Sequence, residues 1–417
     1  MSKRAGKMSD YDVVIVGGGP AGASAAIRLG LAGARVLLAE QKKFPRAKLC
    51  GEFISPECAA HFVALGVLAE MHSAGAARVS TTDFYTRGGR KVSVPSAWFG
   101  DAADGDNQRM AYALGLSRAE MDERLLQRAR AVGVEVWAEA QACGLLLATG
   151  RVGGVELQYE GAVRVVRADV TIDATGRARA LARRVAREQQ RADAGGGGGV
   201  HGARARLVAF KAHLADAELA DGACEIYFYR GGYGGLSRIE GGLSNLCFIV
   251  AAADVRARAS DAARVMREVL MTNRRAAWAL RGASVRSAWL AVALESFGRS
   301  QLVPAAGLLT VGDAAAFIDP FTGSGMLMAL ESGALAADVV ARALPSLRGA
   351  GDFTPLAADY HARYRARFAA RLRVCSLLRR AAFAPPAITT AAALALNTST
   401  GLRRALARAT RQAAVTR

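Results

Sequence analysis

Residues 11–40 read YDVVIVGGGPAGASAAIRLGLAGARVLLAE, and this stretch decides the fold. Tyr11–Val16 is a short run of aromatic and β-branched residues, which is typical of a buried strand. Gly17–Gly22 is a turn of the form G-x-G-x-x-G, residues 23–32 predict a helix of small apolar residues, and a second strand ends at Glu40. This order predicts a parallel β-α-β unit that binds a dinucleotide.

Each glycine of the turn is expected to have its own steric role. Gly17 permits the tight turn, Gly19 lets the backbone approach a pyrophosphate, and Gly22 lets helix and strand pack closely. The helix N-terminus presents free N–H groups that favour an anion such as a diphosphate. Glu40 lies at the separation expected for an acid that binds an adenosine ribose with a free 2′-hydroxyl. A glycine turn without a ligand is the alternative interpretation.

A second glycine-rich segment indicates which dinucleotide fits. Residues 310–315 (TVGDAA) predict a strand that runs into a turn, and residues 318–326 read IDPFTGSGM. This pattern resembles the second FAD signature of geranylgeranyl reductases and of flavoprotein monooxygenases of the p-hydroxybenzoate hydroxylase type. The resemblance implies that Asp313 takes the ribityl hydroxyls of FAD. It also implies that a glycine turn and helix start present backbone N–H groups to the flavin, and that Pro320, Gly323, Gly325 and Met326 belong to the cofactor site.

Two stretches in the middle of the chain match the same families. Arg118, within LSRAEMD (116–122), lies where these families place an FAD-contacting arginine at a helix start. The run DATG (173–176) resembles their third nucleotide-domain motif, which implies that Asp173 and Gly176 belong to the cofactor site. The signatures occur in order over residues 12–333, so the resemblance covers most of the chain. It implies FAD as the cofactor.

The segment FPRAKLCGE (44–52) resembles the segment that follows the second strand in geranylgeranyl reductases, where a cysteine-glycine pair lies close to the flavin. The resemblance implies that Cys50 is near the isoalloxazine. The cations Arg46 and Lys48 are expected to balance phosphate or substrate charge. A buried thiol without reactivity is the alternative interpretation of Cys50, because buried cysteines are commonly inert. Glu52 is a candidate proton donor by its position alone.

Residues 225–237 (EIYFYRGGYGGLS) lie where this family builds the substrate wall over the flavin. Geranylgeranyl reductases usually carry a Tyr-x-Trp-x-Phe-Pro run here, and the YGGLS of residues 233–237 departs from it, which argues against a long prenyl substrate. Tyr233 stands beside glycines that let a ligand approach, so it is the candidate pocket residue. Tyr227 and Tyr229 are expected to pack within strands. The Trp-x-Trp-x-Ile-Pro segment of flavin halogenases is missing, so halogenation is disfavoured.

Composition limits the class of protein. The chain has 417 residues, 52% of them apolar, which excludes a disordered protein and is enough for two or more domains. Six scattered cysteines without a CxxC pair predict neither a disulfide scaffold nor a metal site. The five histidines lie outside the flavin motifs and are expected to be structural or surface residues. A charged start that leads directly into a strand favours a cytoplasmic location.

The net charge of +19 is concentrated toward the C-terminus, where residues 355–417 hold twelve arginines and one acid, or 12 − 1 = +11. We expect a helical hairpin packed on the body with an arginine-coated outer face, and peripheral membrane contact is the alternative. The 22 uncharged residues between Arg380 and Arg403 include Pro385-Pro386 and several Thr, so no membrane span is predicted. Nucleic acid is not a predicted partner, because aromatic residues are sparse among these arginines.

These patterns predict an α/β protein with a Rossmann-type FAD-binding domain, an inserted mixed-sheet substrate domain and a helical C-terminal region. The predicted FAD-binding domain comprises residues 9–78, 111–180 and 296–345, the substrate domain 79–110 and 181–295, and the basic helical region 346–417. The five glycines at 195–199 are expected to form a flexible connector.

The preferred prediction of function is an FAD monooxygenase that acts, through a flavin C4a-hydroperoxide, on a hydrophobic aromatic, polyketide or quinone-like metabolite. O2 is then a substrate, and Cys50 and Tyr233 are the candidate catalytic residues. No second G-x-G-x-x-G follows a strand, so NAD(P)H binds transiently or a partner protein supplies electrons. The alternative is a reductase of a C=C bond in an isoprenoid or related lipid, which Cys50 and the basic tail favour. A quinone electron-transfer protein is a further alternative.

Overall fold

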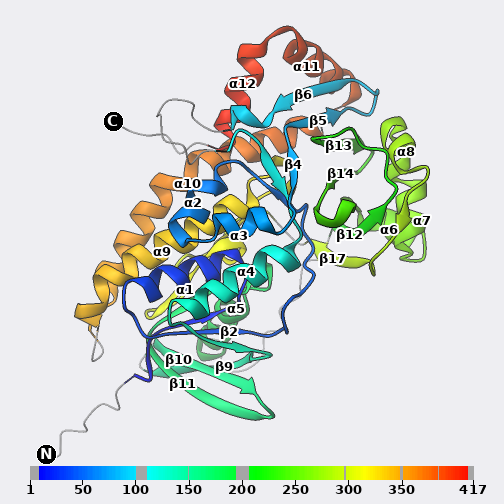
Figure 1. Cartoon of the computed structure of the whole chain (residues 1–417). Coiled ribbons are helices and arrows are strands. Elements are labelled where there is room, and N and C mark those ends of the chain that lie inside the picture. Colours follow the sequence, from blue (N-terminus) through cyan, green and yellow to red (C-terminus); the bar gives the residue numbers. More distant parts are fainter. Residues whose placement is uncertain are drawn as a thin grey trace, which may run out of the picture.

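The computed structural model describes residues 9–99, 110–148, 150–193, 206–294, 297–347, 351–383 and 385–411. Two large sheets form the centres of two lobes, and most helices pack on their outer sides (Figure 1). The glycines at 195–199 and most of the segment 100–110 lie outside the described residues, so the predicted connector is not addressed.

The first sheet has seven strands and contains the predicted β-α-β unit. Its strands are β1 (Tyr11–Val16), β2 (Val36–Glu40), β8 (Glu135–Ala138), β9 (Gln141–Ala148), β10 (Arg151–Tyr159), β11 (Ala162–Asp173) and β19 (Leu308–Thr310). β1 lies between β2 and β11 and pairs in parallel with both. Val13 and Ile15 enter the core on one face, and Val14 and Val16 enter the core on the other. Because both faces are covered, β1 is apolar almost throughout.

Helices from distant parts of the chain cover one face of this sheet. They are α1 (Pro20–Leu31), α2 (Cys58–Leu65), α3 (Leu68–Ser73), α4 (Arg118–Ala131) and α9 (Gly325–Leu347), with α10 (Thr354–Ala382) packed along α9. A Cβ atom on Gly333 of α9 would lie 2.1 Å from the carbonyl oxygen of Ala21. The backbones of α1 and α9 therefore touch, which joins the first glycine motif to the second. The segment before α9 includes two 3₁₀ turns, at Gly312–Ala314 and Pro320–Thr322.

The second sheet has eight strands in mixed pairing. They are β5 (Thr81–Tyr85), β6 (Lys91–Pro95), β12 (Leu207–Ala215), β13 (Ala223–Tyr229), β14 (Gly232–Arg238), β15 (Ser244–Ala251), β16 (Ser284–Val285) and β17 (Leu290–Leu294). One face is covered by α6 (Ala252–Arg256), α7 (Ala262–Glu268) and α8 (Arg274–Leu280). The other face carries a separate apolar cluster that includes Tyr233 and Ile249, and this face borders the site described below.

Smaller elements connect the lobes. β3 (Phe53–Ile54), β4 (Ala77–Val79) and β7 (Ala113–Gly115) form a three-stranded sheet, and β18 (Gly298–Arg299) pairs with β20 (Ala316–Phe317).

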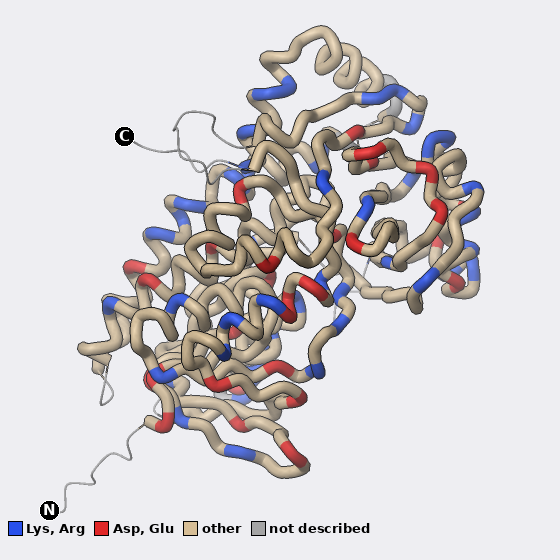
Figure 2. Tube along the Cα trace, viewed as in Figure 1, with Lys and Arg blue, Asp and Glu red and all other residues tan. Residues whose placement is uncertain are grey.

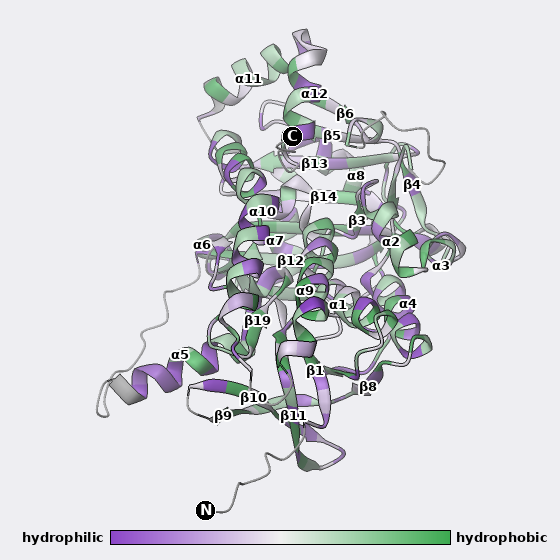
Figure 3. Ribbon diagram, turned by 90° about the vertical axis from the view of Figure 1, so that its left-hand side faces the viewer, coloured by the Kyte–Doolittle hydropathy of each residue, from purple (hydrophilic) through white to green (hydrophobic). Residues whose placement is uncertain are grey.

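Helix α5 (Ala180–Asp193) lies differently from the prediction, which assigned residues from 181 onward to the substrate domain. It packs against β9 and β11 of the first sheet because Leu181 and Val185 are buried in that core. Its hydrophilic remainder points away from the body (Figure 3). The other predicted domain limits stay predictions.

The basic C-terminal region continues from α10 into α11 (Pro386–Thr398) and α12 (Thr400–Ala409). These two helices contact each other and lie against β6 of the second sheet. Lys and Arg positions are spread along the trace (Figure 2), and α12 carries Arg403, Arg404 and Arg408, whereas α11 carries no Lys or Arg. Within the described ranges, no helix has both the length and the apolarity that a membrane crossing requires.

Candidate active site

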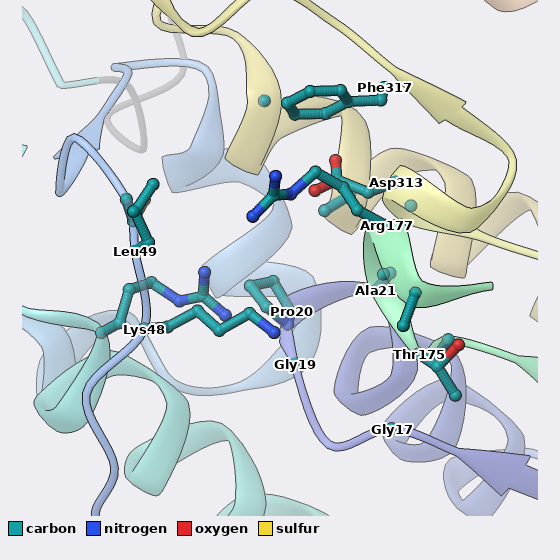
Figure 4. A pocket seen from close by; sticks show the side chains of 18 of the residues that line it. Gly17, Gly19, Pro20, Ala21, Lys48, Leu49, Thr175, Arg177, Asp313 and Phe317 are labelled. Atoms are coloured by element: carbon teal, nitrogen blue, oxygen red, sulfur yellow. The ribbon is translucent and has the colours of Figure 1, made fainter. Parts of the chain in front are cut away.

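A cavity of about 470 Å³ lies between the two lobes (Figure 4). Its walls on the first lobe come from the turn after β1, the segment 46–53, the start of α4, the turn after β11 and the segment before α9. Opposite them stand side chains of the second sheet, namely Ala209, Cys247, Ile249 and Leu294. Segments from both ends of the chain therefore meet at one site.

One end of the cavity, which we call the glycine end, consists of Gly17, Gly19, Pro20 and Ala21 with Arg46, Lys48 and Arg118. Helix α1 begins at Pro20, and its N-cap residue Gly19 offers no side chain to the first turn. The N–H groups of that turn are therefore available to an anion in the cavity.

The steric roles predicted for two of the glycines agree with the geometry. Gly17 has φ +111°, and a Cβ there would lie 2.3 Å from the carbonyl oxygen of Ala174. A Cβ on Gly22 would lie 1.9 Å from the carbonyl oxygen of Gly17. Gly22 does not line the cavity, so its contribution to the site is close packing.

Acidic residues hold the cations of the glycine end in place. Arg118 is the first residue of α4 and donates two hydrogen bonds to Asp122, at 2.8 and 2.7 Å. Arg46 donates to Asp122 at 3.1 Å and to Glu40 at 3.3 Å. With Lys48 also on the cavity wall, three cations stand against two carboxylates. This surplus of positive charge, added to the open helix N-terminus, suits a diphosphate.

Glu40 lines the cavity at the end of β2, as predicted. Its two carboxylate oxygens accept hydrogen bonds from the backbone N–H groups of Gly18, at 2.9 Å, and Lys42, at 3.0 Å. The acid is thus held at the position predicted for a ribose-binding carboxylate.

Asp173, predicted as a cofactor residue, does not line the cavity. Its carboxylate is fully buried and accepts hydrogen bonds from the N–H and hydroxyl of Thr175 and from the N–H groups of Leu181 and Ala182. A buried carboxylate requires such donors. Asp173 therefore shapes the turn that brings Thr175 and Gly176 to the cavity wall.

Arg177 is a cavity residue that the sequence analysis missed, although it directly follows the third motif. It lies beside Asp313 in the cavity, and its guanidinium stands 5.2 Å from the ring centre of Phe317 (Figure 4). Desolvation by the surrounding protein raises the pKa of Asp313, and Arg177 opposes that shift. Desolvation also lowers the pKa of Arg177.

The other end of the cavity is lined by residues of the turn Asp319–Gly323 and by the start of α9 at Gly325, and we call this turn and helix start the turn end. Pro320, Gly323, Gly325 and Met326, which the resemblance assigns to the cofactor site, line the cavity. Gly323 has φ +62°, the left-handed conformation that glycine adopts without steric cost.

Side chains from far along the chain hold the turn end. The Tyr233 hydroxyl donates to Asp319 at 2.6 Å, and the Nε of Arg379 lies 3.0 Å from the other oxygen of that carboxylate. Arg411 donates to the carbonyl oxygens of Thr322, at 2.7 Å, and Gly323, at 3.0 Å. No spacing in the sequence signals the last two contacts.

Cys50 lies half-buried on the cavity wall between the two ends. Its sulfur accepts a hydrogen bond from the N–H of Glu52 at 3.4 Å, and its carbonyl oxygen accepts one from Asn245 at 3.1 Å. Cys247 also lines the cavity, and burial raises the pKa of its thiol to about 12.

Glu52 anchors the same segment to the second sheet. Its buried carboxylate accepts hydrogen bonds from Lys211, from His213 at 2.7 Å and from the N–H of Arg118 at 2.8 Å. Burial pushes the pKa of Glu52 upward, but the hydrogen bond from His213 and the charge of Lys211 outweigh burial and leave it below its ordinary value. The carboxyl is therefore ionised near neutral pH, so Glu52 does not serve as the proton donor that its position suggested.

The sequence analysis assigned no role to Lys211 and expected His213, like the other histidines, to be a structural or surface residue. Lys211 also donates to the carbonyl oxygen of Lys48 at 3.1 Å, so it holds two points of the cysteine segment. The signal was present: these two polar residues alternate within LVAFKAHLA, a strand that is otherwise apolar. In a half-buried strand such residues point to one face.

Tyr233 lines a smaller recess beside the cavity rather than the cavity itself. It is buried, and its hydroxyl is engaged with Asp319. Tyr227 bonds Glu225, and Tyr229 bonds two backbone carbonyls. These two tyrosines pack within strands, as expected.

The fold and the cavity define an FAD-dependent oxidoreductase. The chain belongs to the family described as FAD binding domain, whose model matches residues 10–371. It is similar to a menaquinone reductase of Mycolicibacterium smegmatis, at 27% identity over 342 residues, which are 79% of this chain and 76% of that protein. It is also similar to digeranylgeranylglycerophospholipid reductase 2 of Methanopyrus kandleri, at 36% identity over 168 residues, which are 40% and 38% of the two chains.

Among solved structures, the fold is similar to that of the flavin-dependent brominase Bmp2. The TM-score is 0.75 at 20% identity, and the match covers 96% of this chain and 93% of that one. This likeness concerns the fold.

Proposed function

We propose that this protein is an FAD-dependent reductase that saturates a C=C bond in a hydrophobic substrate carrying an isoprenoid group. The observation that carries the proposal is the similarity to a menaquinone reductase along about four-fifths of this chain. A half-buried thiol on the cavity wall, Cys50, supports it. This choice reverses the order of the two activities weighed from the sequence.

The residues of the cavity suit FAD. Cations and an open helix N-terminus at the glycine end match a diphosphate, and Glu40 offers a carboxylate for a ribose. Asp313 and the start of α9 offer an acid and backbone N–H groups farther along the cavity. When bound, FAD supplies two-electron redox chemistry, with NAD(P)H proposed as the transient reductant.

The chain itself would contribute binding, exclusion of water and a proton. Cys50 is the candidate proton holder at its sulfur atom, because it is half-buried on the cavity wall and its backbone is held by Asn245. Saturation of a C=C bond adds two electrons and two protons, so a proton must reach the carbon that does not receive hydride. Lys211 and His213 act on Cys50 through Glu52 and are positioning residues.

Oxygen transfer to an aromatic or quinone-like substrate is the second candidate function. The small recess beside the cavity favours it, because its volume is about 70 Å³ and its walls include Phe84, Phe99 and Phe321. Such a recess suits a compact ring better than an extended prenyl chain.

The test combines anaerobic and aerobic turnover of the yellow holoprotein. NADPH-reduced protein is mixed, in the absence of oxygen, with an isoprenoid naphthoquinone or a geranylgeranyl lipid. The molecular mass of the product is then measured by mass spectrometry. Gain of two hydrogens that remains after the product is reoxidised in air, which returns any quinol to the quinone, supports the reductase. Incorporation of ¹⁸O from ¹⁸O2 in the aerobic arm instead shows a monooxygenase, and no conversion in either arm overturns both proposals.

A cysteine pair tests the residue assignment. Cys50→Ser is expected to lower kcat by about 10²-fold or more while flavin content is unchanged. Cys143→Ser is the matched control, since Cys143 is also half-buried but does not line the cavity. Equal activity of the two variants would remove Cys50 from the mechanism.

A further inference from the structure

A recess of about 70 Å³ adjoins the flavin cavity on the side of the second sheet. It shares wall residues with that cavity, namely Gly51, Phe53, Cys247, Ile249, Pro320 and Gly323. Its remaining walls are mostly apolar and include Phe84, Phe99, Ile226 and Phe321. A ligand in the cavity can therefore extend one end into an apolar space.

Thr82 is a polar exception in the recess. It lies on β5 two residues before Phe84, so both side chains point from the same face of the strand, and both line the recess. The residue is 7% exposed, and its hydroxyl has no hydrogen-bond partner in the described part of the chain. Buried hydroxyls without partners are costly and uncommon, so this one indicates a ligand group.

Arg411 is the second exception. Among the described residues that line the recess, it alone carries a charge. It is 4% exposed, and its guanidinium stands 4.3 Å from the ring centre of Phe99. Among the described residues its Nε has no hydrogen-bond partner, and Glu57 lies 3.9 Å from that atom as an ion pair. Its bonds to the carbonyls of Thr322 and Gly323 use two of five N–H donors. The guanidinium of Arg411 therefore has N–H donors left for a ligand, and the mostly apolar walls of the recess offer few acceptors for them.

We propose that the recess binds the carbonyl-bearing end of an apolar substrate, and that Thr82 and Arg411 donate hydrogen bonds to that oxygen. A neutral carbonyl suits the site better than an anion, because Glu57 lies 3.9 Å from Arg411 and Asp319 lies 3.0 Å from the neighbouring Arg379. The charges of both arginines are therefore already balanced. A pure hydrocarbon leaves the Thr82 hydroxyl unpaired, whereas a ketone or quinone satisfies it. The inference rests on the proposed function only in that the substrate enters through the flavin cavity.

The test is equilibrium binding to the oxidised holoprotein, measured by calorimetry with two ligands of matched shape. The probes are 2-methyl-1,4-naphthoquinone and 2-methylnaphthalene, which lacks both oxygens. The quinone is expected to bind about tenfold tighter or better. Equal binding of the two probes would overturn the proposal.

Thr82→Val separates recognition from folding. The variant is expected to weaken quinone binding about tenfold and to leave hydrocarbon binding unchanged. Because it removes an unpartnered hydroxyl, its unfolding midpoint should equal or exceed that of the wild type. Thr81→Val is the matched control, since the neighbouring side chain points to the opposite face of β5 and does not line the recess. Unchanged quinone binding in Thr82→Val would overturn the assignment.

Arg411→Gln gives a second arm, with flavin content measured alongside because Arg411 also holds the turn end. It is expected to lower the preference for the quinone further. If the quinone preference depends on Thr82 but no isoprenoid substrate is reduced, the proposed function fails and the recess assignment stands. If substrate is reduced but no variant alters the preference, the recess assignment alone fails.

Discussion

The glycine end and the turn end of the flavin cavity present similar surfaces, a helix N-terminus beside fixed charges, but they are built differently. At the glycine end, a contiguous turn supplies the helix N-terminus, and Glu40, only 22 residues from Gly18, bonds that turn; Arg118 and the Ala174 carbonyl against Gly17 come from farther along the chain. At the turn end, Asp319 is bound by Tyr233, 86 residues away, and Gly323 is bound by Arg411, 88 residues away. The core of the first end is therefore local in sequence, whereas the bonds that hold the second end depend on how the whole chain packs.

Some of the C-terminal arginines also make buried contacts with residues that are distant in the sequence. Arg371 of α10 is 1% exposed, donates to Glu331 of α9 at 2.6 Å and also donates to the backbone carbonyl of Arg411. Arg411 in turn holds the carbonyls of the turn end. Arg371 and Arg411 therefore make buried contacts, although the net charge of the region suggested an arginine-coated outer face. Contact of the remaining arginines with a membrane stays a proposal.

The largest expected effect is at the glycine end. In Gly22→Ala the new Cβ meets the Gly17 carbonyl at 1.9 Å, so the backbone must shift. We expect a loss of stability on the order of 3 kcal/mol or more and protein without FAD. The flavin-to-protein absorbance ratio and urea unfolding measure both. Gly401→Ala is the control, because nothing lies within 4 Å of a Cβ there. If Gly22→Ala binds FAD and is as stable as the wild type, the glycine end does not depend on the close packing of Gly22 against the Gly17 carbonyl.

The next largest effect tests the arginines behind the turn end. Arg371→Met leaves the buried Glu331 without its principal partner, so we expect a loss of about 3–5 kcal/mol in urea unfolding. Arg363→Met, on the same helix, removes a solvent-exposed pair with Asp359 and should cost at most about 1 kcal/mol. Equal losses in the two variants would contradict an interior role for Arg371.

A pH series tests Glu52, which links the cysteine segment to the second sheet. The folded-state pKa of Glu52 is below its ordinary value of 4.5, so its contribution to stability is complete above that pH and is lost as the pH falls through the folded pKa. Glu52→Gln should therefore be less stable than wild type at pH 7, with the difference narrowing toward pH 3. Glu188→Gln, exposed on α5, supplies the same charge change. A difference that stays constant with pH would refute the ion-pair role.

The smallest effect concerns the hydroxyl of Tyr233. Tyr233→Phe removes one of the donors to Asp319 and leaves Arg379 and the N–H of Phe321, so it should cost about 1–3 kcal/mol and loosen FAD binding. Tyr11→Phe, whose hydroxyl bonds Glu135 at an exposed position, should cost less than about 1 kcal/mol. Unfolding and flavin titration give the two readouts. If Tyr233→Phe binds FAD as well as the wild type does, the hydrogen bond between Tyr233 and Asp319 does not hold the turn end in its FAD-binding position.

The sequence by itself determined the parallel β-α-β unit and the glycine turn, and its resemblance to known flavoenzyme families implied FAD as the cofactor. The first two features depend on short-range sterics and on residue periodicity, both of which act within a few residues. The resemblance also placed Arg118 at a helix start, where the side chain of Ser117 caps α4. The motif before α9 could also be identified from the sequence, since Gly323 adopts the left-handed conformation that few other residues tolerate.

Tertiary structure alone decided which side chains complete the site. Asp173 carries a motif signature yet points into the turn, whereas Arg177 and Arg411 carry none and reach the cavity or the recess. Lys211 and His213 meet Glu52 across about 160 residues of chain because β12 runs beside the segment after β2. Such contacts arise from the packing of lobes and helices. Because the residues are far apart in the sequence, the spacing within local motifs does not predict these contacts.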